Sequence, residues 1–192
     1  MNIVLFGPPG AGKGTQADNL VKDLNLFKVS TGDLLRKEIE KKTTLGVKIK
    51  SIIDKGKLVS DEIINNLIEN VMKNKDYLNN LIFDGYPRNL MQAKNLDVLL
   101  EKYNQKISFV LSLKINQEEI IKRILGRQIC SKCGLIFHEF LNPLTNCKYK
   151  CNSKYLQKRS DDNEQTIKYR FATYNKETFP ILNYYENQNL LT

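Results

Sequence analysis

The sequence predicts an α/β fold in which helices flank a central parallel sheet. Short apolar runs that are typical of buried strands alternate with longer segments whose apolar residues recur at helical spacing. The first apolar run, residues 3–6, leads directly into a glycine-rich turn and then into a helical pattern. Parallel sheets built this way bind ligands at the carboxyl ends of their strands, so we expect the functional site at that edge.

In the first part of the chain, helical patterns outnumber strands. Residues 12–24 form the first predicted helix, and residues 27–30 form the second strand. Helical patterns then follow at residues 32–41, 45–55 and 60–73 with no strand between them. We therefore expect these three helices to form an insertion outside the sheet.

The second part of the chain returns to regular alternation. Strands are predicted at residues 81–84 and 108–114, and each is followed by a helix, at residues 89–103 and 116–125. Helical character returns once more over residues 163–179. These elements complete a sheet of parallel strands with helices on both faces.

The glycine-rich turn at residues 7–15 has the spacing of a phosphate-binding loop. Its glycines allow successive backbone N–H groups to point inward, and the helix that follows adds its positive N-terminal end. Lys13 supplies a mobile positive charge for the outer phosphates. The general pattern has Ser or Thr where this chain has Gly14, and Thr15 follows one position later. The turn predicts a nucleotide as the ligand.

Residues 126–162 lack helical periodicity and contain all four cysteines of the chain, Cys130, Cys133, Cys147 and Cys151. Two close pairs of cysteines are typical of one tetrahedral zinc site, whereas unpaired thiols and disulfides are the alternatives, and disulfides are disfavoured in a cytosolic protein. His138, the only histidine of the chain, lies in the same segment and is a possible substitute for one of these ligands. A zinc ion held by four thiolates would be structural, because no coordination position stays open.

Composition and charge limit the classes of protein. With 192 residues, of which 41% are hydrophobic, the chain can bury one core and carry insertions. The net charge of +9 is spread along the chain instead of forming one basic stripe, which argues against a nucleic-acid partner. The sequence has neither an apolar span of membrane length nor a signal peptide, so we expect no membrane partner and a cytoplasmic location.

Two further motifs carry a family resemblance. Residues 30–36 read Ser-Thr-Gly-Asp-Leu-Leu-Arg, and residues 84–88 read Asp-Gly-Tyr-Pro-Arg with Gln92 beyond them. Charged residues farther along match the lid and phosphate clamp of the same family: Arg123, Arg127, Arg159, Asp161, Asp162 and Arg170. With the ending Gly-Lys-Gly-Thr of the phosphate-binding loop, the chain resembles the adenylate kinase family of nucleoside monophosphate kinases, in its bacterial long-lid type. The first cysteine pair is similar to the zinc-bearing lids of that family. The second pair departs from them, because those lids usually place two residues between these ligands and three lie between Cys147 and Cys151 here, so the resemblance supports Cys151 least and His138 could take its place.

The resemblance implies a P-loop kinase that transfers the terminal phosphate of ATP to AMP, giving two ADP, with Mg²⁺ bound to the ATP. It implies ATP contacts at Gly10, Ala11, Gly12, Lys13, Gly14, Thr15, Arg123 and Arg127. It implies AMP contacts at Thr31, Arg36, Lys57, Leu58, Val59, Gly85, Arg88, Gln92, Arg159 and Arg170.

The chemistry of such a transfer depends on positioning and on charge neutralisation more than on covalent help. The resemblance assigns the catalytic charges to Lys13, Arg88, Arg123, Arg159 and Arg170. Asp84, at the end of a strand, would order the water molecules around Mg²⁺. Asp161 and Asp162 would either bond these arginines or cap the helix that begins near residue 163.

The resemblance also divides the chain. Residues 1–29, 60–125 and 163–192 would form the core, residues 30–59 the helical AMP-binding insertion, and residues 126–162 the lid with its zinc site. The family's chain normally continues with a fifth strand and a last helix, so we expect both to be missing here, with effects on the adenine pocket and one sheet edge. A monomer is expected.

Three alternatives stay open. The chain could phosphorylate UMP, CMP or GMP, although Thr31 and Gln92 look like the family's adenine-recognising residues and a threonine at position 31 disfavours the pyrimidine enzymes. It could also bind nucleotides without turnover, if the short C-terminus has removed needed structure. A zinc-containing nucleic-acid binder is the third alternative, and it leaves both phosphate-site motifs unexplained.

Overall fold

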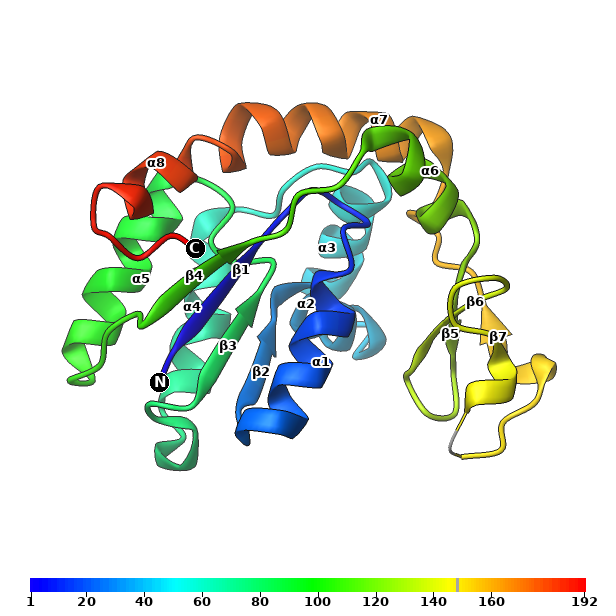
Figure 1. Cartoon of the computed structure of the whole chain (residues 1–192), viewed down its shortest axis with the longest axis horizontal. Coiled ribbons are helices and arrows are strands. Elements are labelled where there is room, and N and C mark those ends of the chain that lie inside the picture. The colour runs from blue at the N-terminus through cyan, green and yellow to red at the C-terminus, as the bar shows by residue number, and fades with distance from the viewer. Residues whose placement is uncertain (148) are drawn as a thin grey trace.

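The computed structural model describes residues 1–147 and 149–192 and is organised around a four-stranded parallel sheet. Its strands are β1 (Ile3–Phe6), β2 (Phe27–Ser30), β3 (Leu81–Asp84) and β4 (Phe109–Ser112), arranged in the order β2-β3-β1-β4 (Figure 1). β1 lies inside the sheet and is buried along its whole length, as its continuous apolar run predicts. The α/β fold class is confirmed.

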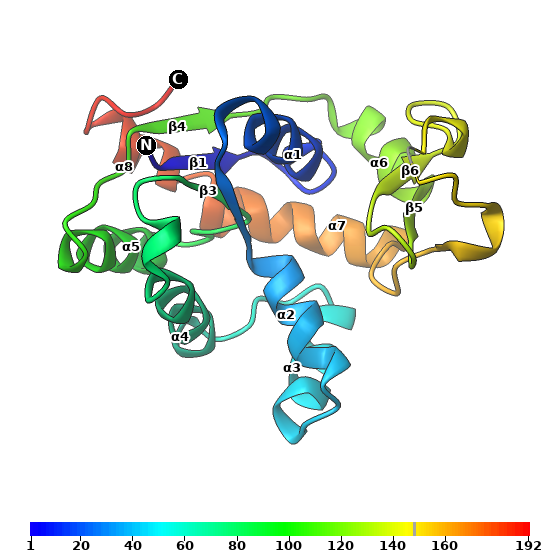
Figure 2. The same ribbon diagram turned by 90° about the horizontal axis from the view of Figure 1, so that it is seen from below.

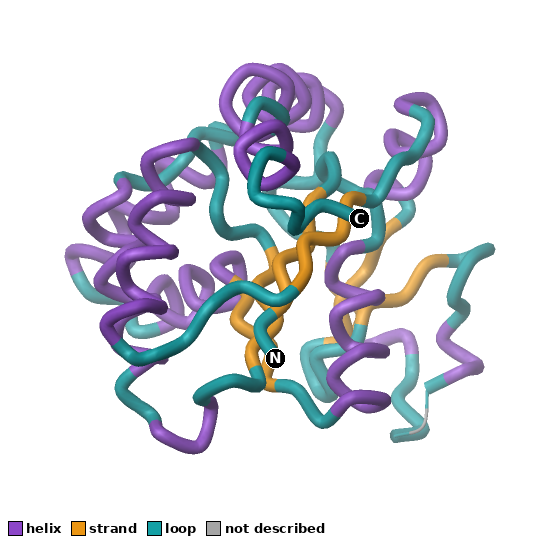
Figure 3. Tube along the Cα trace, turned by 60° about the vertical axis from the view of Figure 1, so that its left-hand side comes forward, coloured by secondary structure: helices purple, strands orange, loops and turns teal. Residues whose placement is uncertain are grey.

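Helices cover both faces of this sheet (Figure 3). On one face, α1 (Lys13–Leu24) packs over a small core that includes Ile3 and Leu5. The other face carries α4 (Asp61–Met72), α5 (Leu90–Lys102) and α8 (Ile181–Glu186). Successive side chains of a strand point to opposite faces, so β1 supplies apolar residues to both cores.

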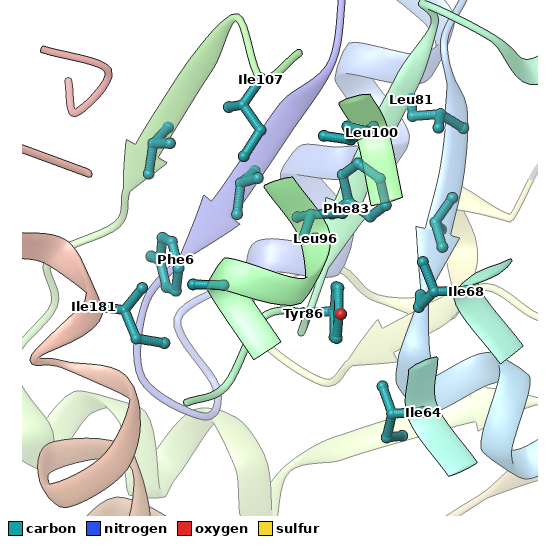
Figure 4. Packing of buried hydrophobic residues seen from close by; sticks show 14 of the residues in the cluster. Phe6, Ile64, Ile68, Leu81, Phe83, Tyr86, Leu96, Leu100, Ile107 and Ile181 are labelled. Atoms are coloured by element: carbon teal, nitrogen blue, oxygen red, sulfur yellow. The ribbon is translucent and has the colours of Figure 1, made fainter. Parts of the chain in front are cut away.

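The larger core joins segments that are far apart in the sequence. Phe83 of β3 and Tyr86 just after it pack with Leu96 of α5 and Ile181 of α8 (Figure 4). Ile68 of α4 is fully buried in the same cluster. The prediction from the helical pattern that the third helical segment belongs to an insertion outside the sheet was therefore wrong, because the apolar side of α4 faces the main core. The division drawn from the family resemblance had instead counted this segment with the core.

Two helices do project from the sheet, α2 (Thr31–Glu40) and α3 (Thr44–Asp54) (Figure 2). Both begin at capping side chains, since the Ser30 hydroxyl accepts a hydrogen bond from a backbone N–H of α2 and the Thr43 hydroxyl does the same for α3. Gly46 lets the two helices touch through their backbones, because a Cβ there would lie 2.5 Å from the Glu38 carbonyl oxygen. A short 3₁₀ turn, Lys75–Tyr77, precedes β3.

A separate antiparallel sheet stands apart from the central one (Figure 1). Its strands are β5 (Arg127–Cys130), β6 (Ile136–His138) and β7 (Leu156–Gln157), in the order β6-β5-β7. The sequence pattern predicted no strands here, because strands of two to four residues are too short to show an alternation. Two 3₁₀ turns, Leu144–Asn146 and Ser153–Tyr155, complete this unit.

Two helices connect this unit to the core: α6 (Gln117–Leu125) precedes it in the chain, and α7 (Glu164–Thr173) follows it. A π-helical turn, Tyr174–Thr178, continues α7 toward α8. Among the described residues, no helix has the length and apolar character that a membrane crossing requires.

The last residues correct one expectation about the C-terminus. The Val110 N–H of β4 donates to the Leu190 carbonyl at 2.9 Å, and the Thr192 N–H donates to the Val110 carbonyl at 2.8 Å. Leu191 pairs with Val110 in the parallel sense. Residues 190–192 therefore pair with β4 through a parallel bridge at this edge of the sheet, where we expected no fifth strand.

Candidate active site

A cavity of about 810 Å³ opens at the carboxyl ends of the central strands, between the phosphate-binding loop, α2 and the antiparallel sheet. Every nucleotide-contacting residue that the sequence predicted lines it. These residues are Gly10, Ala11, Gly12, Lys13, Gly14, Thr15, Thr31, Arg36, Lys57, Leu58, Val59, Asp84, Gly85, Arg88, Gln92, Arg123, Arg127, Arg159 and Arg170. They come from six separate stretches of sequence, so the fold alone brings them together.

The glycine-rich turn needs its glycines for two reasons. Gly10 and Gly12 have left-handed backbones, with φ angles of 81° and 89°. At Gly10 a Cβ would also lie 2.6 Å from the Ile124 side chain, so only glycine lets α6 pack directly on the turn. This contact ties the turn to the helix that carries Arg123.

Lys13 folds back over the turn as the first residue of α1. Its Nζ donates to the Gly7 and Pro8 carbonyl oxygens at 2.7 and 3.0 Å. Burial lowers the pKa of Lys13 to about 8; the Asp84 carboxylate opposes this shift, and the charge of Arg88 adds to it. The side chain therefore lacks a sufficient counter-charge, and an anionic ligand such as a phosphate would supply one.

Hydrogen bonds hold the facing wall of the cavity in place. The Thr31 hydroxyl and the Arg88 Nε–H both donate to the Gly85 carbonyl at 2.7 Å. The Arg88 N–H donates to Gln92 Oε1 at 2.8 Å, and Gln92 Nε2 donates to Asp61 Oδ1 at 2.7 Å. Sequence reasoning did not identify Asp61, because its role depends on α4 meeting α5 and no local motif marks it.

Arg88 is the most constrained cation of this wall. Burial lowers its pKa to about 10, with the charge of Arg170 as the next cause, so the guanidinium stays charged at neutral pH. Arg36, one helix away, pairs with Asp33 of its own helix. The two guanidinium groups offer planar donor pairs that suit a phosphate.

Asp161 and Asp162 organise the remaining arginines. Asp161 accepts from Arg159 Nε and NH2 at 2.9 and 2.8 Å, and it also pairs with Arg170 at 2.8 Å. Burial alone would raise the pKa of Asp161, but the charges of Arg159 and Arg170 outweigh it and hold the pKa below its usual value. Asp162 binds Arg127 through both carboxylate oxygens.

This arrangement answers the question left open by the sequence. Both aspartates bond arginines, whereas the cap of α7 is Asn163, whose side chain accepts from the Thr166 N–H.

The four cysteines meet at the far end of the antiparallel sheet. The sulfur atoms of Cys130, Cys133 and Cys151 all lie within 4.8 Å of one another, and Cys147 Sγ lies 4.0 Å from Cys133 Sγ. All four are free of disulfides. Three mutually close thiols with the Cys147 thiol beside one of them suit a tetrahedral zinc ion, so the residues present fit such a metal.

His138 lies away from these thiols, at the junction with α6. Its Nδ1 accepts from the Phe140 N–H at 3.2 Å, and its Nε2 lies 3.4 Å from the Lys122 carbonyl oxygen. The ring therefore holds β6 against the end of α6. The structure thus favours Cys151 over His138 as the fourth member of the cluster.

Comparison with known proteins agrees with this geometry. A family model described as adenylate kinase matches residues 5–190. An adenylate kinase of Pelagibacter ubique is 47% identical over all of this chain and 90% of that protein. An adenylate kinase of Methanosarcina barkeri is 44% identical over the whole chain and 89% of its own length, and one of Mycoplasma capricolum is 44% identical over 98% of the chain and 88% of its own length. The chain belongs to the adenylate kinase family.

Proposed function

We propose that this protein is an adenylate kinase that transfers the terminal phosphate of ATP to AMP, reversibly and with Mg²⁺, giving two ADP. The observation that carries the proposal is the pairing of two phosphate-binding walls across one cavity. Lys13 and the glycine-rich turn form one wall, and Arg88 with Arg36 forms the other. A site built for a single nucleotide would not need the second wall.

The proposed mechanism relies on charges that are already in place. The turn and Lys13 would hold the outer phosphates of ATP, while Arg36 and Arg88 hold the phosphate of AMP opposite them. Arg159 and Arg170, joined by Asp161, would lie against the transferred group and stabilise the charge on its oxygens. Closing the cavity would exclude water, which competes with AMP as the acceptor.

Two metal ions belong to the proposal. Asp84 lines the cavity beside the turn, close to Gly14, and it would order the water molecules around Mg²⁺ next to the phosphates. When bound, Mg²⁺ neutralises phosphate charge. The cysteine cluster would hold a structural zinc that stiffens residues 126–162 as the lid, with residues 30–59 as the AMP-binding insertion.

The deciding experiment is a coupled assay of ADP formation with ATP and each of AMP, UMP, CMP and GMP. We expect AMP to be used with a far higher kcat/KM than the other three. Equal or better use of another monophosphate would assign the chain to that substrate instead. Tight nucleotide binding without ADP formation would favour a protein that binds without turnover. A cytoplasmic location, a monomeric state and the lack of a nucleic-acid partner stay predictions.

A further inference from the structure

Arg88 is held by side chains on both sides of its backbone. Its N–H donates to Gln92 Oε1 at 2.8 Å, and its carbonyl oxygen accepts from the Thr178 hydroxyl at 2.7 Å. Its Nε–H is also engaged, by the Gly85 carbonyl at 2.7 Å. The terminal amino groups of the guanidinium can therefore bind a phosphate, while hydrogen bonds hold the backbone and Nε of Arg88 in place.

Thr178 reaches Arg88 from the π-helical turn that follows α7. In this turn the Phe179 N–H donates to the Tyr174 carbonyl, five residues back, at 2.8 Å. A π turn holds one residue more than an α turn and so shifts the helix positions that follow it. Thr178, at the end of the turn, is 8% exposed, and its hydroxyl lies against the loop that carries Arg88. No sequence motif signals this contact, since 90 residues separate its partners.

We propose that Thr178 is a positioning residue for the acceptor phosphate. Its hydroxyl donates a hydrogen bond to the Arg88 carbonyl and so fixes the backbone of Arg88. The guanidinium is then already oriented toward the phosphate, and binding avoids the entropy cost of ordering a free arginine. The proposal rests on the proposed function, because it assumes that Arg88 binds the phosphate of AMP.

The same helical run would couple two of the phosphate-binding arginines. Arg170 lies in α7, eight positions before Thr178, and pairs with Asp161 at 2.8 Å. The run from α7 to the π turn therefore carries one of these arginines directly and holds a second, Arg88, through its carbonyl. A shift of this run would move both groups together.

The test compares Thr178→Val, which keeps the shape and removes the hydroxyl, with Thr178→Ser, which keeps the hydroxyl. For Thr178→Val we expect KM for AMP to rise about tenfold, as leaving a buried carbonyl unpaired predicts, with KM for ATP within about twofold of the wild type. Thr178→Ser should restore KM for AMP. The matched control is Thr166→Val in α7, whose buried hydroxyl also donates to a distant carbonyl, that of Asp54 at 3.4 Å, and which lies outside the residues that line the cavity; it should leave KM for AMP within about twofold of the wild type.

A second measurement separates positioning from general destabilisation. Calorimetry should show weaker binding of AMP to Thr178→Val and unchanged binding of adenosine, which lacks the phosphate that Arg88 would hold. Equal weakening of both ligands, or a Thr178→Val protein with wild-type KM for AMP, would overturn the proposal.

Thr178→Ala replaces Thr178→Val if the latter does not fold, and failure of both to fold would also overturn it, because the hydroxyl would then serve folding. A wild-type chain that does not phosphorylate AMP would instead reject the proposed function.

Discussion

Single side chains decide the electrostatics of this site, and Lys13 is the clearest case. It projects from the start of α1 over the glycine-rich turn, where it meets two carbonyl oxygens and no bonded carboxylate. We expect Lys13→Ala to lower kcat by about a hundredfold or more, because a preorganised charge on the transferred group is worth about 3 kcal/mol. Steady-state kinetics with ATP and AMP measure this loss of kcat. The control is Lys22→Ala, which removes an exposed lysine of the same helix and should leave kcat at the wild-type value.

The pH profile should report the same lysine. Burial lowers the pKa of Lys13 to about 8, so the ammonium is charged below that pH and neutral above it. In the free enzyme, kcat/KM for ATP should therefore fall as the pH rises through about 8. Bound phosphate would raise the pKa again, so kcat should hold to higher pH than kcat/KM. A kcat/KM that stays level to pH 9.5 would contradict this assignment, and Lys13→Arg should remove the basic limb.

At the scale of elements, the antiparallel sheet depends on its cysteine cluster. This small unit has a core made largely of the cysteines themselves with Phe137 and a few neighbours, which is little apolar material for a stable fold. Purified protein should contain about one zinc per chain. Cys133→Ser and Cys151→Ser should each lose the metal and lower Tm, whereas His138→Ala should keep it. Metal analysis that finds no zinc in protein prepared without chelators would reject the site.

The junction between the glycine-rich turn and α6 gives a second prediction at this scale. Gly10→Ala would place a methyl group 2.6 Å from Ile124 in a backbone with φ of 81°. We expect a loss of unfolding free energy of about 2–4 kcal/mol, from backbone strain and overpacking together. Gly134→Ala is the matched control, because the backbone there also has a positive φ, of 72°, but an added Cβ would have no neighbouring atom within 4 Å. It should therefore cost only the backbone strain, about 1–2 kcal/mol. Similar losses in both, measured by urea denaturation, would mean that the contact with Ile124 carries no weight.

For the whole molecule, the arrangement of two projecting units predicts a motion. The α2–α3 pair and the antiparallel sheet project from the core as two separate units (Figure 2), and residues of both line the cavity. Their arginines must reach phosphates over the turn, while substrates still need an open path. The segment that returns from the sheet already touches α3, since the Ser160 hydroxyl donates to Asp54 Oδ1 at 2.8 Å. Substrate-driven lid closure is the behaviour expected of this family. We place the hinges at Gly126–Arg127 and at residues 160–163.

A fluorescence experiment tests this closure. Probes at Leu144, in a 3₁₀ turn beside the antiparallel sheet, and at Lys48 in α3 should come closer when two adenosines joined by a polyphosphate saturate the protein. Thiol-reactive labels would also attack the four native cysteines. The labels are therefore introduced through unnatural amino acids at the two positions. Unchanged energy transfer at saturation would reject the two-unit closure, whereas closure with AMP alone would assign the motion to α2 and α3.

The sequence by itself determined the parts whose cause is local. Buried-type runs predicted β1 and β3 with their observed bounds, the capping pattern at Asn116 predicted the start of α6, and the spacing of Gly7, Gly12 and Lys13 predicted the phosphate-binding turn. Each of these depends on neighbours a few residues away, so the pattern is complete in the sequence. The family's motifs identified the cavity residues along the chain, whereas the fold brings their separate stretches together.

Only the tertiary structure decided what depends on distant segments. It packs α4 against the main core and places residues 190–192 beside β4. It also places Cys151 near the other thiols and His138 beside α6. It also brought Asp61 to Gln92 and Thr178 to Arg88. Short strands and single hydrogen bonds carry no periodicity, and their partners are chosen by packing across the whole chain. Such contacts exist only once the core has formed.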